Sequence, residues 1–553
     1  MGDRVAGGMA SRIVRPAGWG TLAAFAARRG RRMGPAAAAG AAGLILFTTS
    51  PLFYLLASTL AEGARGVSAL LSGSLLWLIA RTLLLATLAT IWALILGLPP
   101  AWILTRTDLP GRRLFRVLGV LPLAIPPYIG AFTYITLLGP VGLVNKAYQA
   151  IGGSGQIVNI YSIWGGVLVL GLFTYPYILL FASSALEGFD PALEEAARAA
   201  GYGPLEIFLR VTLPLLRPSL LAGSLLVFLY ALSDFGAVSF LRLTTFTTEI
   251  YQQLNTRLDH VSAAGLSNVL VLLTIVVLLA QRKSLGGRGF VQRRGGARPP
   301  TVHPLGRFKF PALLGTLLVL GGSIVLPVGL LVYQVGAPST LLPGLLANRG
   351  YLWHSLWTAG IAATAASGVG LFASYWARRF GGPASLLLTA ATQLGYAIPG
   401  TVLGLSLILL YNSYLPWIYG TSAMVVLGYL LRYLPQAVQG SAAALTQVDP
   451  DLEDAARGLG RSGWQALREV TLPLIRPGMA AGWTLVFISS MKELAATLLL
   501  RPPGFDTLPV RIWIATIEAD YAGAAAVSLV LIATTAVPLF LIARLDTGIS
   551  PLD

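Results

Sequence analysis

Long apolar segments dominate this sequence and decide which solvent the chain can fold in. Twelve of them approach or exceed the length of about 20 residues that a helix needs to cross a bilayer core of roughly 30 Å. Inside that core every backbone polar group must bond within the protein, which a helix achieves. We therefore predict an all-α integral membrane protein with about 12 transmembrane helices. The predicted spans are residues 37–60, 75–102, 115–138, 160–185, 219–241, 262–280, 310–334, 351–376, 384–411, 421–444, 478–500 and 523–543.

Composition supports a membrane chain and argues against several kinds of site. Hydrophobic residues make up 55 % of the chain and charged residues 11 %, whereas soluble chains carry about 25 % charge. The chain has no Cys, which excludes disulfides, iron–sulfur clusters and thiolate metal sites. Its three His are scattered, so we predict no metal site and no cofactor bound by this chain. The net charge is +17, and the arginines that produce it lie between apolar segments. This distribution indicates membrane topology and predicts no nucleic-acid partner.

The basic residues also predict how the chain is oriented, because cytoplasmic loops are enriched in Lys and Arg. The tail at 1–36 holds seven arginines, and the segment 281–309 holds eight basic residues and no acid. The loop at 139–159, predicted outside, has only Lys146. We predict that both termini are cytoplasmic. The tail resembles the start of a signal peptide, but the next span is too long for a signal core, so we interpret it as a retained helix.

The segment 281–309 is rich in Gly, Arg and Pro and has no apolar period, which is typical of a linker. It separates two halves of six predicted spans each. The predicted domains are a cytoplasmic basic tail at 1–36, a first half at 37–280, the basic linker at 281–309 and a second half at 310–545.

Two polar segments are near-copies of each other. Residues 190–218 and 449–477 match at 15 of 29 positions without a gap, at an offset of 259 residues. Because apolar helices resemble one another through composition alone, a match between polar segments is stronger evidence of internal duplication. Both segments follow the fourth span of their half, so the two six-helix repeats are predicted to be parallel.

Each copy is predicted to form two short helices around a glycine turn on the cytoplasmic side. Gly201 ends the first helix, since glycine readily adopts positive φ. A compact element with a small apolar face suits docking into a groove of a partner, although an ordinary interhelical loop is the alternative. The expected apolar face is Leu193, Ala196, Ala197 and Ala200, opposite Glu194, Glu195 and Arg198.

The spacing within these copies resembles the EAA loop of bacterial ATP-binding-cassette importer permeases. The matching residues are Glu195-Ala196-Ala197, Gly201 and Leu213-Pro214 in the first copy, and Asp454-Ala455-Ala456, Gly460 and Leu472-Pro473 in the second. The one departure is Asp454, where the family has Glu. The resemblance implies two fused halves with the type I importer permease fold. It also implies that both loops are coupling helices seated on ATPase subunits.

The chain itself lacks the means to hydrolyse ATP. It has four lysines, and none lies in a GxxxxGK[ST] loop, the phosphate cradle of such ATPases. We therefore predict a transport subunit that is not an enzyme, with ATP and Mg bound by two partner ATPase subunits. A substrate-binding protein is expected to dock outside on the loops at 242–261 and 501–522, and the membrane is the bacterial cytoplasmic (inner) membrane.

A finer resemblance is to fused ferric-iron permeases. It is carried by Ser233 to Ser239 with Thr244 to Thr248, and by Lys492 to Pro502 with Gly504 to Thr507. Ala495 stands where that subgroup has Pro. The resemblance implies ferric iron as cargo. Fused permeases for thiamine and other small solutes share much of this pattern and remain the alternative.

Several charges fall toward the outer ends of the fifth spans, where a charge is expensive to bury. One interpretation is that Asp234, Glu493 and Lys492 line a translocation path or gate. The other is that they pair with each other or with Arg242 and Arg501 and hold the outer gate shut. Arg432 is either a cavity residue or a snorkelling one.

Two functions of other classes compete with an importer permease. A secondary transporter driven by an ion gradient is compatible with two parallel halves but leaves the duplicated polar loops unexplained. A membrane enzyme requires a cluster of His, Asp or Ser at membrane depth, which the sequence does not indicate. The sequence therefore favours the permease subunit of an ATP-driven, binding-protein-dependent importer.

Overall fold

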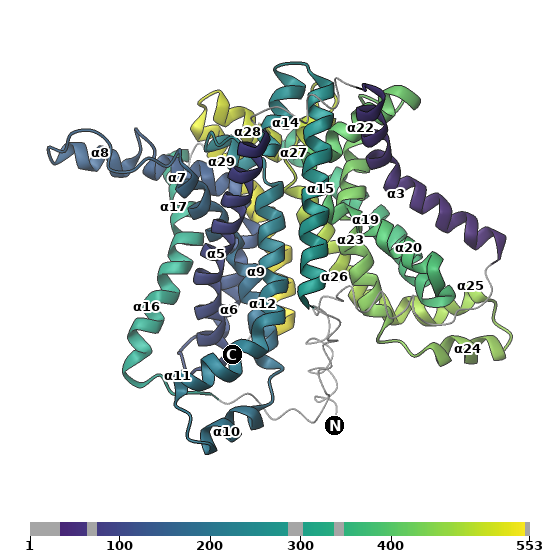
Figure 1. The fold of residues 1–553 in the computed structure, drawn as a ribbon, viewed down its shortest axis with the longest axis horizontal. Helices are drawn as coiled ribbons and strands as arrows, with labels where there is room; N and C mark the ends of the chain where they lie inside the picture. Colours follow the sequence, from purple (N-terminus) through teal and green to yellow (C-terminus); the bar gives the residue numbers. More distant parts are fainter. Residues whose placement is uncertain (1–33, 64–74, 286–301, 337–347, 548–553) are drawn as a thin grey trace. The chain divides into compact units, whose positions relative to one another are not determined.

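The computed structural model describes residues 34–63, 75–285, 302–336 and 348–547 (Figure 1). The tail at 1–33 and the linker residues 286–301, with most of the predicted cytoplasmic arginines, lie outside these ranges. Within them every regular element is a helix, and the single β-bridge joins Thr107 to His303. The prediction of an all-α protein is confirmed for this part of the chain.

The helices form two compact units, each made mostly of one half of the chain. The first-half unit holds α5 (Leu75–Arg106), α6 (Arg112–Val120), η1 (Leu121–Ala124), α7 (Pro127–Leu138), α8 (Leu143–Ala150), α9 (Ile163–Glu187), α10 (Pro191–Ala199), α11 (Pro204–Ile207), η2 (Phe208–Thr212), α12 (Leu213–Ser233), α13 (Gly236–Phe240), η3 (Gly306–Phe308), α16 (Lys309–Leu320), η4 (Gly321–Val325) and α17 (Leu326–Val335). The second-half unit holds α3 (Pro35–Ala61), α19 (Arg349–Phe380), α20 (Gly382–Thr392), α21 (Leu394–Ala397), α22 (Gly400–Tyr414), α23 (Ser422–Leu445), α24 (Pro450–Gly458), α25 (Gly463–Ala466), η5 (Leu467–Thr471), α26 (Leu472–Met491), α27 (Ala495–Leu500), α28 (Leu508–Ile517) and α29 (Tyr521–Thr547). The unit boundary falls within α14 (Phe246–Asn255) and α15 (His260–Leu285).

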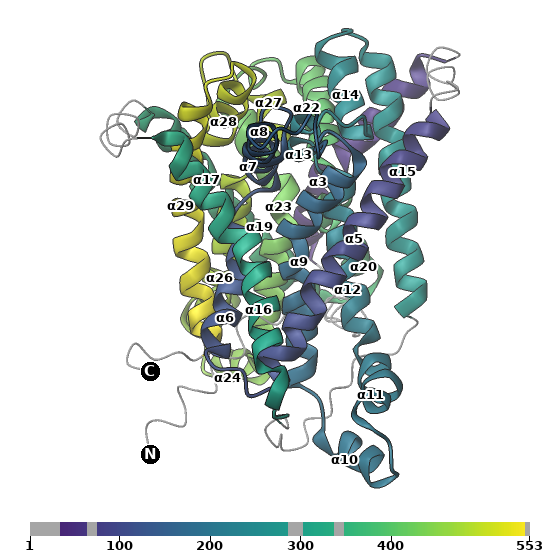
Figure 2. The ribbon, with the colours of Figure 1, turned by 90° about the vertical axis from the view of Figure 1, so that its left-hand side faces the viewer.

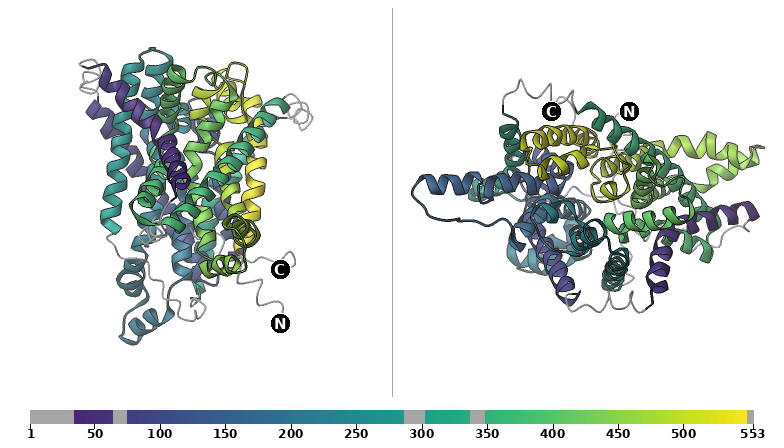
Figure 3. Two further views of the ribbon diagram at one scale, coloured as in Figure 1. Left: turned by 90° about the vertical axis from the view of Figure 1, so that its right-hand side faces the viewer. Right: turned by 90° about the horizontal axis from the view of Figure 1, so that it is seen from above.

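The first helix of each half belongs to the unit of the other half. Helix α3 packs on α20 and α22 (Figure 3), and the indole of Trp376 in α19 donates to the carbonyl of Ala37 at 2.9 Å. Helices α16 and α17 pack in the first-half unit, where the hydroxyl of Tyr134 donates to the carbonyl of Gly322 at 3.0 Å. The linker therefore joins two halves that have exchanged one helix each.

The described residues contain ten helices long and apolar enough to cross a membrane. A bent pair, Gly382–Tyr396 and Gly400–Tyr414, would make an eleventh span, with a 111° bend. The tenth predicted span, 421–444, is the helix α23, but it is not apolar enough to count because Arg432, Gln436 and Gln439 lower its hydropathy. By length and composition the count is ten or eleven, slightly below the predicted twelve.

Proline explains the largest error in the predicted spans. Residues 115–138 were expected to form one helix, but the chain breaks between α6 and α7, where Pro122, Pro126 and Pro127 supply no backbone N–H. The apolar span instead runs from Pro127 to Ala150. Pro399 likewise caps α22 at the bend, whereas Pro176 and Pro435 lie inside the single helices α9 and α23.

Small residues let the second and fourth predicted spans of each half approach closely. A Cβ added at Gly97 in α5 would lie 2.8 Å from the carbonyl oxygen of Tyr175 in α9. At the corresponding place in the other half, a Cβ at Gly370 in α19 would lie 2.8 Å from the backbone of Ala437 in α23. Close backbone approach through glycine is how membrane helices gain van der Waals contact without a hydrophobic driving force.

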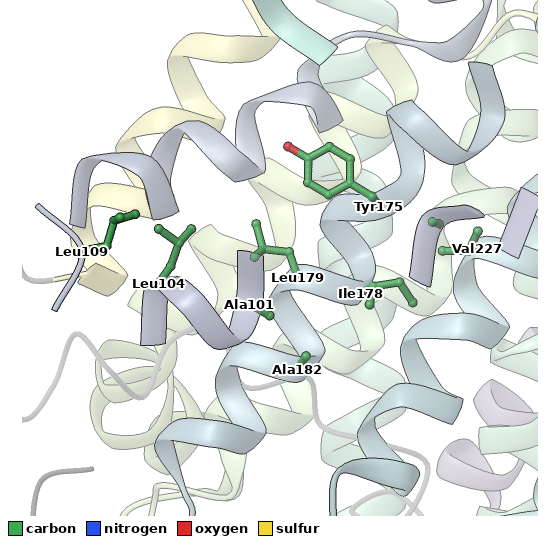
Figure 4. Packing of buried hydrophobic residues seen from close by; sticks show 9 residues of the cluster. Ala101, Leu104, Leu109, Tyr175, Ile178, Leu179, Ala182 and Val227 are labelled. Atoms are coloured by element: carbon green, nitrogen blue, oxygen red, sulfur yellow. The ribbon is translucent and has the colours of Figure 1, made fainter. Parts of the chain in front are cut away.

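In the first-half unit, an apolar cluster surrounds the contact between Gly97 and α9. Side chains of α9 lie against α5 and α12 (Figure 4). Its buried members are Ala93, Ala101, Leu104, Leu109, Tyr175, Ile178, Leu179, Ala182 and Val227. The cluster holds the end of α5, and hence Arg106, in place beside the first of the two polar loops described below.

The glycine contact in the second-half unit can be tested with a neighbouring glycine as control. Gly370→Ala is expected to lower the stability of the detergent-purified chain by about 1–3 kcal/mol, because the new methyl group overlaps the backbone of Ala437. Gly368, two residues away in the same helix, has open space around it, so Gly368→Ala should leave the thermal midpoint unchanged or slightly raised. Equal midpoints for the two variants would contradict this packing.

Candidate functional site

The first polar copy forms a helix–turn–helix beyond the ends of α9 and α12 (Figure 2). The side chain of Asp190 caps α10 by accepting the N–H of Ala192 at 3.0 Å. Gly201, at φ +87°, ends the helix: its N–H bonds to Arg198, and the N–H of Tyr202 bonds to the carbonyl of Ala197. These two bonds form a Schellman motif, which requires the left-handed glycine.

The second copy repeats each of these features. Asp449 caps α24 by accepting the N–H of Asp451 at 3.1 Å. Gly460 has φ +86°, its N–H bonds to Arg457, and the N–H of Arg461 bonds to Ala456. The sequence duplication is therefore a duplication of local structure. We call residues 190–212 the first polar loop and residues 449–471 the second polar loop.

One side of α10 is buried. The buried positions are Pro191, Glu194 and Ala197, whereas Leu193 is 48 % exposed. Ala196 and Ala200 are exposed as well. Three of the four residues of the expected apolar face are thus exposed, but Ala197 is buried, and so is Glu194, which was expected on the opposite face. The ion pair with Arg106 draws Glu194 inward.

Both polar loops consequently present large apolar side chains outward. The exposed residues of the first loop are Leu193, Tyr202, Leu205 and Leu209, and those of the second are Leu452, Leu459 and Trp464. Leu193 corresponds to Leu452 at the 259-residue offset, and Leu205 corresponds to Trp464. Two copies of an exposed apolar surface at equivalent places are typical of a surface that another protein covers.

Glu194 is the centre of the first polar loop. Its carboxylate lies 2.6 Å from Nη2 of Arg106, which is fully buried at the end of α5. Thr212 donates its hydroxyl to the other carboxylate oxygen at 3.3 Å, and Nε2 of His303 lies at 3.5 Å. These contacts join α10 to a membrane helix, to the segment that leads into α12, and to the linker.

The electrostatics of this cluster keep Glu194 ionised. Burial alone would raise its pKa, but hydrogen bonding to His303 and the charge of Arg106 outweigh burial and lower the pKa to about 2. A carboxylate with a lowered pKa contributes stability that is complete above its ordinary pKa of 4.5 and is lost as the pH falls toward 2. The cluster is therefore intact at neutral pH.

The second polar loop has an equivalent carboxylate, Glu453. It accepts the hydroxyl of Thr471, the counterpart of Thr212, and the hydroxyl of Tyr375 at 3.0 Å. The guanidinium of Arg379 donates to that tyrosine hydroxyl at 2.9 Å. Arg379 therefore reaches Glu453 through the hydroxyl of Tyr375, whereas in the first loop Arg106 contacts Glu194 directly.

The residues identified from the EAA resemblance lie around these carboxylates. Glu195 and Asp454 are exposed, and so are Ala196 and Ala455. Leu213-Pro214 and Leu472-Pro473 begin α12 and α26. The remaining members, Ala197, Ala456, Gly201 and Gly460, lie at the buried side or at the turn. Glu194 and Glu453 were not predicted as site residues. The sequence does contain a signal for them, because both are Glu at the 259-residue offset and each lies three residues before a matching Ala.

Asp234 and Glu493 occupy equivalent breaks after α12 and α26. Asp234 accepts the N–H groups of Ala237 and Val238 at 2.9 and 3.2 Å and so caps the short helix α13. Glu493 accepts the N–H of Ala496 at 3.0 Å at the start of α27. Both buried carboxylates therefore satisfy backbone donors where a helix ends inside the protein.

Glu493 also takes part in a buried ion pair. Nε of Arg432 lies 3.0 Å from its carboxylate, and the hydroxyl of Tyr433 bonds to the same oxygen. Arg432 donates further to the carbonyl of Ile398 at 3.1 Å, beside the 111° bend. Arg432 thus points into the protein and does not snorkel.

The other predicted path residues have local contacts. Arg501 pairs with Asp506, and Arg242 lies 5.1 Å from the ring centre of Tyr161. Lys492 is partly buried at the end of α26.

Comparison with known proteins finds the same family twice in this chain. The family model for the binding-protein-dependent transport system inner membrane component matches residues 89–284 and again 366–551. The two matches contain the first and the second polar loop, respectively.

Several relatives cover most of the chain. An Fe(3+)-transport system permease protein, FbpB 2, from Haemophilus influenzae is 30 % identical over 499 residues, 89 % of this chain and 94 % of that protein. A ferric transport system permease protein, FbpB, from Actinobacillus pleuropneumoniae is 27 % identical over 77 % of this chain and 65 % of its own length. A putative 2-aminoethylphosphonate transport system permease protein, PhnV, from Salmonella typhimurium is 32 % identical over 34 % of this chain and 73 % of its own length.

The neighbouring carboxylates Glu194 and Glu195 offer a test of the buried cluster. Glu194→Gln leaves the charge of Arg106 without its buried partner, a loss that typically costs about 3–5 kcal/mol. Glu195 is exposed, so Glu195→Gln should change stability by less than about 0.5 kcal/mol. Thermal midpoints of the two purified variants measure the difference, and a midpoint of Glu194→Gln equal to that of Glu195→Gln would contradict the cluster.

Proposed function

This chain belongs to the family of binding-protein-dependent transport system inner membrane components, and from that premise we propose that it couples ATP hydrolysis on partner subunits to the inward transport of ferric iron. It is a multi-pass permease of the inner membrane in which both halves of the transporter are fused in one chain. The proposal concerns the coupling, the partners and the cargo.

The observation that carries the coupling proposal is the pair of outward-facing apolar loops. Each loop is anchored on its inner side by a carboxylate, the buried Glu194 or the half-buried Glu453. Each presents a leucine at the same place on its outer side, Leu193 or Leu452. An amphipathic helix of this kind fits a groove in a partner protein. Two such helices support two ATPase subunits, which carry the ATP and Mg that this chain has no P-loop to bind.

The fold supplies a mechanical link from each loop into the membrane. The helical segment Pro204–Ser233 runs without interruption from α11 through η2 and α12, and Gly463–Met491 does the same in the second half. A displacement of a polar loop is therefore transmitted along a helix to the break at Asp234 or Glu493. On this proposal, ATP binding by the partners moves the loops and shifts the population between outward-facing and inward-facing states.

A substrate-binding protein is proposed to deliver the cargo on the outer side. Its docking sites would be the regions 242–261 and 501–522, which follow the two breaks and correspond at the repeat offset. Binding of the loaded protein and binding of ATP would then favour the same conformation of the permease.

Ferric iron is proposed as cargo because relatives that match most of this chain are named as ferric-iron permeases. The relative named for 2-aminoethylphosphonate matches only a third of this chain, so it indicates the shared permease architecture. Thiamine or another small solute remains the alternative cargo.

The docking role of the loops can be tested through their exposed leucines. Leu193→Glu combined with Leu452→Glu places charge on both outward faces without touching the buried side. When the affinity-tagged chain is purified from its own membranes, we expect the ATPase activity that co-purifies with it to fall about ten-fold or more. Ile151→Glu, a change at an exposed aliphatic residue outside both polar loops and outside the regions 242–261 and 501–522, should leave capture unchanged. Full capture with the double variant would rule out these faces as the docking surface. Transport by the chain without any ATPase would also rule them out and would favour a secondary transporter.

The cargo can be tested by uptake of radiolabelled ferric iron into cells with and without the chain. We expect uptake to require the chain and to be unaffected by excess unlabelled thiamine or manganese. Uptake that does not depend on the chain would refute iron as cargo and leave the permease assignment unchanged.

A further inference from the structure

The end of the linker is bonded to the loop that precedes α6. The N–H of His303 donates to the carbonyl of Arg106 at 2.8 Å, and the N–H of Asp108 donates to the carbonyl of His303 at 3.3 Å. The carboxylate of Asp108 then accepts the N–H of Leu305 and the ammonium of Lys309, both at 2.8 Å. The ammonium of Lys309 is the largest influence that lowers the pKa of Asp108. Residues 303–309 are thus held along one side of this loop.

These bonds bring the imidazole of His303 to the first polar loop. Its ring lies parallel to the indole of Trp102, with centroids 6.1 Å apart and 12° between the planes. Nε2 lies 3.5 Å from the carboxylate of Glu194, on the oxygen that also meets Arg106. A linker residue therefore completes the cluster that anchors α10.

The second half has a different residue at the place that corresponds to Trp102. At an offset of 273 residues, where Ala124-Ile125-Pro126 matches Ala397-Ile398-Pro399, Arg106 corresponds to Arg379 and Trp102 corresponds to Tyr375. Tyr375 supplies its own hydroxyl to Glu453, and Arg379 bonds to that hydroxyl. Trp102 has no hydroxyl, and the imidazole stacked on it supplies the polar group instead.

We propose that His303 is a positioning residue for the first polar loop and that it takes the place of the Tyr375 hydroxyl in the second. The end of the linker then helps to anchor the first loop, whereas the contacts of Glu453 within the described residues come from its own half. The two loops are alike on their outer faces but anchored by different means. The consequence for coupling rests on the proposed function, whereas the anchoring itself does not.

Amide hydrogen exchange on the full-length purified chain tests the anchoring, with each loop serving as the control for the other. His303→Ala should raise exchange in residues 190–212 by about ten-fold or more, because a contact with a charged group is lost, and leave residues 449–471 unchanged. Tyr375→Phe should do the reverse. Val302→Ala, at an exposed neighbouring position, should change neither loop. Unchanged exchange in 190–212 for His303→Ala, or equal rises in both loops, would overturn the proposal.

A rescue variant separates positioning from a general loss of stability. Trp102→Tyr combined with His303→Ala recreates the arrangement of the second half and should restore protection of residues 190–212. Trp102→Phe combined with His303→Ala supplies a ring without a hydroxyl and should not. Equal protection in the two double variants would show that the polar group is irrelevant and would overturn the proposal.

Transport measurements then distinguish this inference from the proposed function. If His303→Ala raises exchange as expected and also raises the ATP hydrolysed per ferric ion transported, both stand. If exchange rises while that ratio stays at the wild-type value, the anchoring by the linker stands and the coupling role of the first loop fails.

Discussion

Two inward-facing carboxylates, the buried Glu194 and the half-buried Glu453, hold the polar loops against the membrane helices, and the other features of these loops depend on them. A carboxylate drawn into the protein must meet a cation or a strong donor, and each finds an arginine, directly or through a tyrosine hydroxyl. Because these carboxylates face inward, the leucines one position earlier face outward. Charge on the inner side thus leaves an apolar surface on the outer side, the surface that we propose docks on the partner subunits.

The internal duplication extends from sequence to packing. Glycine contacts between the second and fourth predicted spans, Schellman turns at Gly201 and Gly460, and capped helix breaks at Asp234 and Glu493 recur in both halves. The halves differ where a polar group is supplied by a different residue. Asp234 caps its helix, whereas Glu493 also pairs with Arg432. Such differences mean that two similar loops need not respond equally to the same displacement.

Most of the membrane architecture could be predicted from the sequence, because a helix in lipid depends on a long apolar run and little else. The errors occurred where backbone chemistry or burial competes with hydropathy. Prolines divided residues 115–138 into two helices. Glu194 was expected opposite the apolar face of α10, with Glu195 and Arg198, but it is buried because it pairs with Arg106, and nothing near Glu194 in the sequence reveals Arg106.

By itself, therefore, the sequence determined the class of protein, the duplicated loops with their caps and glycine turns, and the absence of a P-loop, since each of these depends on residues that are neighbours in the chain. Only the tertiary structure decided which carboxylates are buried, that α3 and α16–α17 pack with the opposite halves, and that His303 completes the cluster at Glu194. Those outcomes depend on contacts between residues tens to hundreds of positions apart, whose partners are chosen by packing and by the cost of leaving a buried charge unpaired.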